Sequence, residues 1–252
     1  MTRLPDILAR IAVGAAILVH LAGAARAADV TVMCPPPMRA VLTDLVAAFE
    51  RESGLRVAMI LAPSKEIVAR LEAGEKADVV VLTAAAADGL IKAGKVARRV
   101  ELAHSTIGVA VRHGAPKPDI GSADAFRRTL LAAKSFARNE GADSGVYMKG
   151  LIERLGITDR MAPKTTLVTT GYVAALVAKG EVEIAAQQVS ELMSVPGIDV
   201  TPLGADIQHV IVFSAAVAAQ PAAREAVEAL IRFLTSPDAA PMIRAKGLEP
   251  VP

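Results

Sequence analysis

Residues 29–61 read DVTVMCPPPMRAVLTDLVAAFERESGLRVAMIL and contain a pattern that is repeated along the chain. A short apolar run at 29–33 comes first, and the three prolines that follow remove three backbone N–H donors. Apolar residues then recur at helical spacing, at Val41, Leu42, Leu45, Val46 and Phe49. Gly54 ends this segment, and a second apolar run occupies 55–61. Strand, helix and strand in this order predict a parallel sheet with a helix packed on it.

The same alternation continues through the chain and predicts an α/β fold whose parallel-rich sheets are covered by helices. Further strands are expected at 77–83, 105–111, 135–138, 166–169, 183–187 and 210–218. Helices are expected to begin at Ser64 and Ser144 and to occupy 171–179 and 221–234. Ser236 and Pro237 have the residue types of an N-cap and a first helical position, which predicts a last helix running to Gly247.

The first 27 residues have the composition of a secretory signal peptide. Two early arginines precede an apolar centre at 11–21, and Ala25-Arg26-Ala27 has the form of an A-x-A cleavage site. The apolar centre is shorter than the roughly 20 residues that a membrane span requires, so an uncleaved anchor is the weaker alternative. We therefore expect export to the periplasm and a mature chain that begins at Ala28.

Charge and composition exclude several classes of partner. The chain has 28 basic and 26 acidic residues, and removal of residues 1–27 takes away three of the former and one of the latter. The mature chain is then neutral, has no tryptophan and few aromatic residues, and offers neither a basic patch nor a stacking platform for nucleic acid. Its single cysteine cannot form an internal disulfide.

Motifs for catalysis are weak. The mature chain retains three histidines, His104, His113 and His209, without metal-ligand spacing, and it has neither a P-loop nor a dinucleotide-binding glycine motif. A serine hydrolase that uses Ser144 with His209 and an aspartate is the weakest of the functional alternatives, because triads are identified by geometry. We expect no enzyme activity, no cofactor and no metal site.

Several helices are expected to begin after short loops of polar or small residues, near Met38, Ser64, Ser144 and Gly171. The first turn of a helix has free N–H groups and a positive potential, so termini of this kind that meet in one cleft can bind an anion. A serine at such a position is also an ordinary helix cap.

One segment, RHGAPKPDIGSADAF at 112–126, changes in composition to a polar stretch rich in proline and glycine. Its composition is equally consistent with a connection between two lobes and with an exposed loop.

Four stretches carry a family resemblance: SKEIVARLEAGEKADVVVLTAAAADGLIKAGKV, GADSGVYMKGLIERLGI, TTGYVAALVAKGEVEIAAQQVSEL and FLTSPDAAPMIRAKGLEP. Together they resemble the periplasmic substrate-binding proteins of ABC transporters, in particular the molybdate-binding type with its type II periplasmic binding fold. The resemblance implies two α/β lobes joined by two hinge crossovers. It places lobe one at 28–108 and 209–252, and lobe two at 109–208.

The resemblance also implies which loops meet the ligand. The implied set is Cys34, Pro37, Ser64, Lys65, Asp143, Ser144, Gly145, Tyr172 and Gln188. Gln188 replaces a tyrosine of the molybdate binders, and Gln187 takes this place if the register shifts by one residue. For two of these residues the ordinary alternative is the favoured one: free cysteines are commonly buried in the core, as Cys34 then is, and lysines are mostly solvated, as Lys65 then is at its helix start.

Two departures from the molybdate-binding pattern affect the expected ligand. The first ligand loop has prolines where the family has a serine, and Asp143 adds a carboxylate near the second lobe's site. An unpaired negative charge beside a dianion is costly, so a small organic acid or another small polar metabolite fits better than molybdate.

The expected function is therefore capture of a small anionic ligand, an organic acid or an oxyanion, between the lobes of a monomeric periplasmic receptor. Such a receptor delivers its ligand to an inner-membrane ABC permease after hinge closure. A periplasmic sensor or accessory protein with the same fold is the main alternative.

Overall fold

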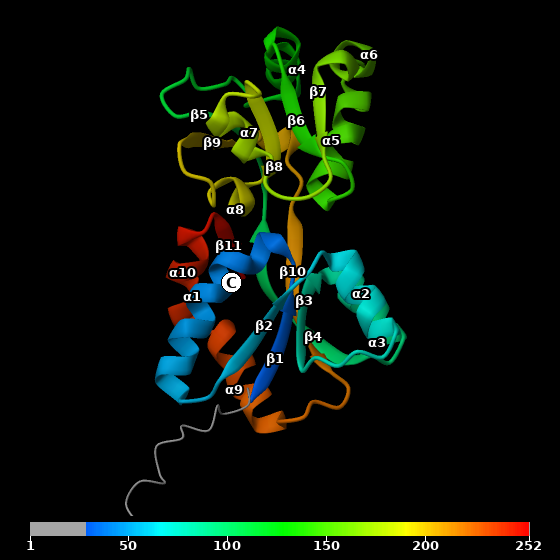
Figure 1. Cartoon of the computed structure of the whole chain (residues 1–252), viewed down its shortest axis with the longest axis vertical. Coiled ribbons are helices and arrows are strands. Elements are labelled where there is room, and N and C mark those ends of the chain that lie inside the picture. Colours follow the sequence, from blue (N-terminus) through cyan, green and yellow to red (C-terminus); the bar gives the residue numbers. More distant parts are fainter. Residues whose placement is uncertain (1–28, 252) are drawn as a thin grey trace, which may run out of the picture.

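The computed structural model describes residues 29–251, so the predicted signal peptide at 1–27 lies outside the described residues. The chain forms two lobes, one above the other in Figure 1, and each has its own sheet. The first sheet has the order β11-β4-β10-β3-β1-β2 and the second the order β7-β6-β8-β5-β9. Helices pack on both sheets, which confirms the α/β class, but both sheets also contain antiparallel pairs, so they are mixed and not parallel-rich as predicted.

Lobe one is built from both ends of the described chain. Its strands are β1 (Val30–Cys34), β2 (Val57–Leu61), β3 (Val79–Thr83), β4 (Val96–Ser105), β10 (Ile211–Ala218) and β11 (Leu248–Pro250). Its helices are α1 (Pro36–Ser53), α2 (Ser64–Glu72), α3 (Ala84–Lys92), α9 (Arg224–Leu234) and α10 (Ala240–Ala245), with a 3-10 turn η3 (Pro237–Ala239). Alternate residues of β1 divide between the two faces: Val32 packs with α1 and α9, and Met33 packs with α2 and α3.

Lobe two comes from the middle of the sequence. Its strands are β5 (Ile107–Arg112), β6 (Phe136–Asn139), β7 (Thr165–Val168), β8 (Ile184–Gln188) and β9 (Ile198–Pro202). Its helices are α4 (Ala123–Ala132), α5 (Asp143–Arg154), α6 (Thr158–Met161), α7 (Ala174–Lys179) and α8 (Val189–Leu192), with turns η1 (Ala162–Lys164) and η2 (Ala205–Ile207). Phe136 and Ala186 pack under α4 and α5, and Ala137 and Ala185 pack under α7.

Two chain crossings join the lobes. β4 ends at Ser105 and β5 begins at Ile107, and the chain returns after η2 into β10. The side-chain amide of Gln208 connects the two crossings: its oxygen accepts from the backbone N–H of Ile107 at 2.8 Å, and its nitrogen donates to the carbonyl of Ile107 at 3.0 Å. The strand expected at 105–111 therefore contains the hinge and is divided by it.

The structure decides between the two alternatives for 112–126 and corrects other predictions. The segment is the exposed loop and does not join the lobes, because it connects β5 to α4 within lobe two and its last four residues already belong to α4. The helices expected at 171–179 and 221–234 begin three residues later than predicted. Ser236 precedes the last helical segment, but its hydroxyl donates to the carbonyl of Phe233 at 2.8 Å and does not cap the helix.

Three strands were not predicted: β4, β9 and β11. β4 has charged residues at Arg98, Arg99 and Glu101, and β9 is a half-buried edge strand that contains Asp199 and ends in proline. Neither has the apolar run that marks an interior strand. No helix within residues 29–251 is long and apolar enough to cross a membrane.

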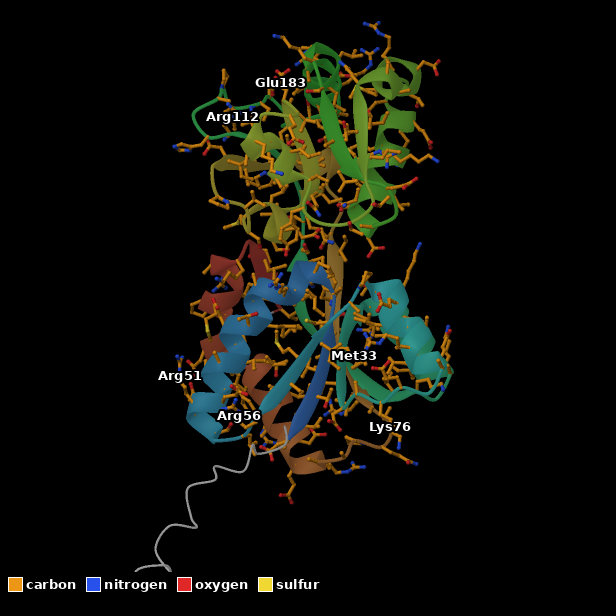
Figure 2. All side chains as sticks on the ribbon, in the orientation of Figure 1. Met33, Arg51, Arg56, Lys76, Arg112 and Glu183 are labelled. Atoms are coloured by element: carbon orange, nitrogen blue, oxygen red, sulfur yellow. The ribbon has the colours of Figure 1, made fainter. Side chains whose placement is uncertain are left out.

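Figure 2 labels Met33 and several charged residues along the long axis of the molecule. Met33 lies inside lobe one, whereas Arg51, Arg56 and Lys76 lie toward its outer end. Arg112 and Glu183 lie on the part of lobe two that is far from lobe one. The labelled charged residues thus lie away from the region where the lobes meet, so the chemistry of that region comes from other residues.

Candidate functional site

An open cleft of about 690 Å³ lies between the lobes. Lobe one contributes residues at the start of α2 and at the β3–α3 junction, lobe two contributes the β6–α5 loop and the first turns of α5, and the hinge closes one side. The lining residues are Lys65, Thr83, Ala84, Ala85, Gly141, Asp143, Val146, Tyr147, His209, Ile211 and Val212. Two other cavities, of about 240 and 630 Å³, are lined by residues of lobe two alone. Only a cavity shared by both lobes changes when the hinge moves, so this cleft is the candidate site.

The first loop of lobe one is poor in hydrogen-bond donors, as the sequence predicts. α1 starts at Pro36 with Pro37 next and Pro35 at the N-cap position, so none of these three residues has an N–H group. The first available N–H, that of Met38, donates to the carbonyl of Pro35 at 3.0 Å. The start of α1 therefore presents an apolar surface, and it lies across from lobe two, where α8 contacts α1.

Cys34 is fully buried as the last residue of β1 and packs in the lobe-one core with Met38 and Val81. Burial raises the pKa of its thiol to about 11, and the nearby Arg39 only partly offsets this. At neutral pH the thiol is therefore protonated and unreactive. Cys34 is not among the residues that line the cleft.

The second loop of lobe one supplies the cation. Ser64 is the first residue of α2, after Pro63 at the N-cap position, and it is half-buried. Lys65 follows in the first turn and lines the cleft with an exposed side chain. An exposed ammonium group at this edge can reach a ligand carboxylate without a desolvation cost of its own.

The facing end of lobe two has a different character, because it contains buried polar side chains. Asn139 and Gln188 end the neighbouring parallel strands β6 and β8, and both are almost inaccessible to solvent. Side-chain oxygens with no hydrogen-bond partner in the described part of the chain are found here on Asn139, Ser144, Gln188, Ser190 and Glu191. Native proteins rarely leave such atoms unpaired, since each costs about 1–3 kcal/mol.

Ser144 and Gly145 lie where α5 starts. Gly145 is packed so closely on the end of β6 that a Cβ atom here would overlap the carbonyl of Asn139, which explains the glycine. Ser144 is fully buried, and within residues 29–251 its hydroxyl contacts no histidine or other hydrogen-bond partner. The Ser–His pair that a serine hydrolase requires is therefore not formed.

The two glutamines at the end of β8 have different roles. The oxygen of Gln187 accepts from the backbone N–H of Val173 at 3.0 Å, and its nitrogen lies 3.5 Å from the carbonyl of Gly171. Gln187 thus holds the loop that carries the half-buried Tyr172. Gln188 points to the opposite face of the strand, and its oxygen has no hydrogen-bond partner among the described residues.

Glu191 is the residue that the sequence analysis missed. It lies in α8, three positions after Gln188, and only 5% of its surface is exposed. Burial raises the pKa of its carboxyl to about 8, and the negative Asp143 adds to the effect, while hydrogen bonds from the Gln187 side chain and the Gln188 backbone oppose it. The run QQVSE, directly after the apolar residues of β8, was the available signal, because strand ends of α/β proteins are common sites.

The hinge side of the cleft contains an aromatic pair. The rings of Tyr147 and His209 are stacked, with centroids 4.6 Å apart and an interplanar angle of 11°. The hydroxyl of Tyr147 donates to the carbonyl of Ile207 at 2.7 Å, which ties α5 to the returning hinge crossing. His209 therefore has a packing role next to the hinge.

Comparison with known proteins agrees with this geometry. The model of the family of bacterial extracellular solute-binding proteins matches residues 30–249. An aconitate isomerase from Pseudomonas sp. is 37% identical over 261 residues, which span 99% of this chain and 98% of that protein.

Two solved structures are similar at low sequence identity. The periplasmic molybdate-binding protein of Azotobacter vinelandii has a TM-score of 0.74 at 17% identity, over 88% of this chain and 99% of its own. Peb3 of Campylobacter jejuni has a TM-score of 0.68 at 15% identity, over 88% of this chain and 100% of its own. The chain therefore belongs to the bacterial extracellular solute-binding proteins and has the two-lobed fold of the periplasmic molybdate-binding proteins.

Proposed function

We propose that the chain binds a small organic acid with more than one carboxylate between its two lobes. The observation that carries the proposal is the pair of buried, unpaired side chains on lobe two, Ser144 and Gln188. Leaving them unpaired costs free energy that a ligand would recover by accepting a hydrogen bond from the Ser144 hydroxyl and by donating one to the Gln188 oxygen from a hydroxyl or a protonated carboxyl group. Lys65 on the opposite side of the cleft supplies a positive charge for a carboxylate.

Two features favour a carboxylic acid over a tetrahedral oxyanion. The first loop has lost its N–H donors to Pro36 and Pro37, and a dianion that is desolvated on all sides needs donors from both lobes. Moreover, the relative with 37% identity is named for aconitate, which is a tricarboxylic acid. A planar, elongated acid can place one carboxylate near Lys65 and another against lobe two.

In this proposal the protein acts as a periplasmic receptor that closes on its ligand and delivers it to an ABC permease. The family match and the hinge at Thr106 support such a role. A sensor that signals to a membrane partner uses the same closure, and a neighbouring permease and ATPase, rather than a sensor kinase, would favour transport.

The test is a panel of ligands measured by thermal shift and calorimetry, since the chain has no tryptophan for fluorescence. A ligand that binds only the folded state stabilises it by about 2.7 kcal/mol at a concentration of 100 times Kd. We expect di- and tricarboxylates to raise Tm, and monocarboxylates, molybdate and tungstate to raise it less. A larger shift with molybdate than with every carboxylate would contradict the proposal.

A second candidate function is isomerisation of the bound acid. It is favoured by the full-length match to an aconitate isomerase and by a buried carboxyl, Glu191, beside the cleft. Incubation of the purified protein with one aconitate isomer, followed by NMR detection of the other, tests it directly.

A further inference from the structure

The buried carboxyl of Glu191 is a group that a protein which only binds its ligand does not need. Its Oε2 atom has no hydrogen-bond partner in the described residues, and the side chain is 95% shielded from solvent. A carboxylate in such a position is unfavourable unless something pairs with it, and a salt bridge to Glu191 is not found in residues 29–251. A purely structural role leaves this atom unexplained.

Part of the arrangement is structural. Glu191 is the third residue after Gln188, the N-cap of α8, and accepts from the Gln188 backbone N–H as in a capping box. This contact needs one acceptor oxygen and no proton. The second oxygen remains free.

The position of α8 connects Glu191 to the cleft. Asp143, which lines the cleft, is close enough to act electrostatically on the Glu191 carboxyl. Of the proposed ligand contacts, Gln188 is the N-cap residue of α8, and Ser144 follows Asp143 in α5. α8 also contacts α1 of lobe one, so a hinge motion that separates the lobes would break this contact.

We propose that Glu191 is the catalytic residue that carries a proton between two carbon atoms of an unsaturated polycarboxylic acid bound in the cleft. The inference rests on the proposed binding of such an acid. Oε2 takes a proton from a CH₂ group that lies between a carboxylate and a C=C bond, and the C–H electron pair forms a new C=C bond with the adjacent carbon. The electrons of the original double bond move to its far carbon, which takes the proton back from Glu191. Atoms and electrons balance, and no further reactant is needed.

The electrostatics of the carboxyl suit this role. A group that both accepts and returns a proton works best when its pKa is close to the working pH. Burial and Asp143 raise the pKa of Glu191 to about 8, so both forms are populated near neutrality. The hydroxyl of Ser144 is available to donate to a carboxylate on which negative charge increases during the transfer, whereas the unpaired oxygen of Gln188 can only accept a hydrogen bond.

The experiment compares the full mature chain with Glu191→Gln, using cis- and trans-aconitate as probes. We expect the wild type to interconvert the isomers, and Glu191→Gln to lose at least about 100-fold in kcat while Kd changes only a few-fold, as is typical of a lost general base. The amide keeps the capping oxygen and the side-chain volume. Glu181→Gln, on an exposed residue of the same lobe, is the matched control and should keep wild-type turnover.

The outcomes separate the two proposals. Binding of aconitate by the wild type without interconversion, and without deuterium uptake in D₂O, overturns the role of Glu191 and leaves the binding function intact. Failure to bind any carboxylate overturns both. Full turnover by Glu191→Gln overturns the catalytic role of Glu191 and leaves the binding function intact. If Glu191→Gln does not fold, Glu191→Asp, which keeps the carboxyl but shortens its reach, should lower kcat with an unchanged KM, and an unchanged kcat would contradict the proposal.

Discussion

The two lobes face the cleft with opposite chemistry. Lobe one presents prolines without N–H groups, the alanines 84 and 85, and a single exposed charge on Lys65. Lobe two lines the cleft with Asp143, Val146 and Tyr147. It also contains buried side chains with unpaired oxygens that do not line the cleft, among them Ser144, Gln188 and Glu191. Selectivity and chemistry are therefore expected to depend on lobe two, while lobe one covers the ligand and supplies charge.

The asymmetry also separates stability from function. In lobe one the one side-chain oxygen of this kind among the described residues is that of Ser105 at the hinge, and changes elsewhere near the cleft should affect the fold in the ordinary way. In lobe two the unpaired groups lower the stability of the ligand-free protein, as is common at binding and catalytic sites. Substitutions that distinguish the lobes should therefore move stability and ligand affinity in different directions.

The largest expected effect concerns Glu191 and pH. Its pKa is about 8 when folded and near 4.5 when unfolded, so between these values the folded state holds a proton that the unfolded state releases. The free energy of unfolding should thus fall as pH rises from about 4.5 to 8, and remain constant above. At about 1.4 kcal/mol for each pKa unit, the loss amounts to at most about 5 kcal/mol.

Denaturant unfolding of the wild type and Glu191→Gln at pH 5, 6.5 and 8 measures this contribution, because the titrations of other groups cancel in the difference. The groups that act on the Glu191 carboxyl are the charged Asp143 of α5 and two neutral hydrogen-bond donors at the end of β8, the Gln187 side chain and the Gln188 backbone. We expect the free energy of unfolding of Glu191→Gln, relative to that of the wild type, to increase as pH rises. A constant difference across this range would show that the Glu191 carboxyl is solvated like an ordinary glutamate.

A second prediction uses the two adjacent glutamines as a matched pair. Gln188→Leu removes an unpaired acceptor oxygen and should leave Tm unchanged or raise it, while weakening by roughly 10-fold or more the binding of an acid that donates to this oxygen through a hydroxyl or a protonated carboxyl. Gln187→Leu removes the acceptor of the Val173 N–H and should cost about 1–3 kcal/mol of stability. Thermal unfolding and calorimetry on both variants test this, and equal loss of stability in the two would contradict the distinction.

The difference between these glutamines also shows what the sequence could and could not predict. Apolar periodicity located the strands that lie inside the sheets, and the proline run indicated a donor-poor loop at Pro36 and Pro37. The charged strand β4 and the edge strand β9 were missed, because their side chains do not form an apolar run.

The site was harder to predict for a physical reason. Whether Gln187 or Gln188 faces a ligand depends on the register between β8 and its neighbours, and one residue reverses the face. The importance of Glu191 depends on its burial, and α8 packs against β5, β8 and β9 of its own lobe and against α1 of the other. The run QQVSE indicated a strand end, but these contacts between segments far apart in sequence are not visible in it.

A third prediction tests the charge on lobe one. Lys65→Met keeps most of the length of the side chain but removes its charge, and should weaken carboxylate binding by about 2- to 5-fold, the scale of an exposed ion pair. The loss should shrink in high salt, because exposed charges are screened. Lys92→Met, on an exposed lysine in the last turn of α3, is the control, and calorimetry at two salt concentrations is the measurement.

The smallest effect is expected at Cys34. The sequence placed this residue in the ligand-binding set, but the structure buries it in the core of lobe one. The thiol is fully buried among core residues, and its pKa is raised to about 11, so it should react with iodoacetamide only when the protein unfolds. Cys34→Ala should cost on the order of 1 kcal/mol of stability through lost packing, and leave ligand affinity within about two-fold. A Kd that rises by 10-fold in a folded Cys34→Ala protein would place the thiol against the ligand, and the apolar wall of lobe one would then contribute to selectivity as lobe two does.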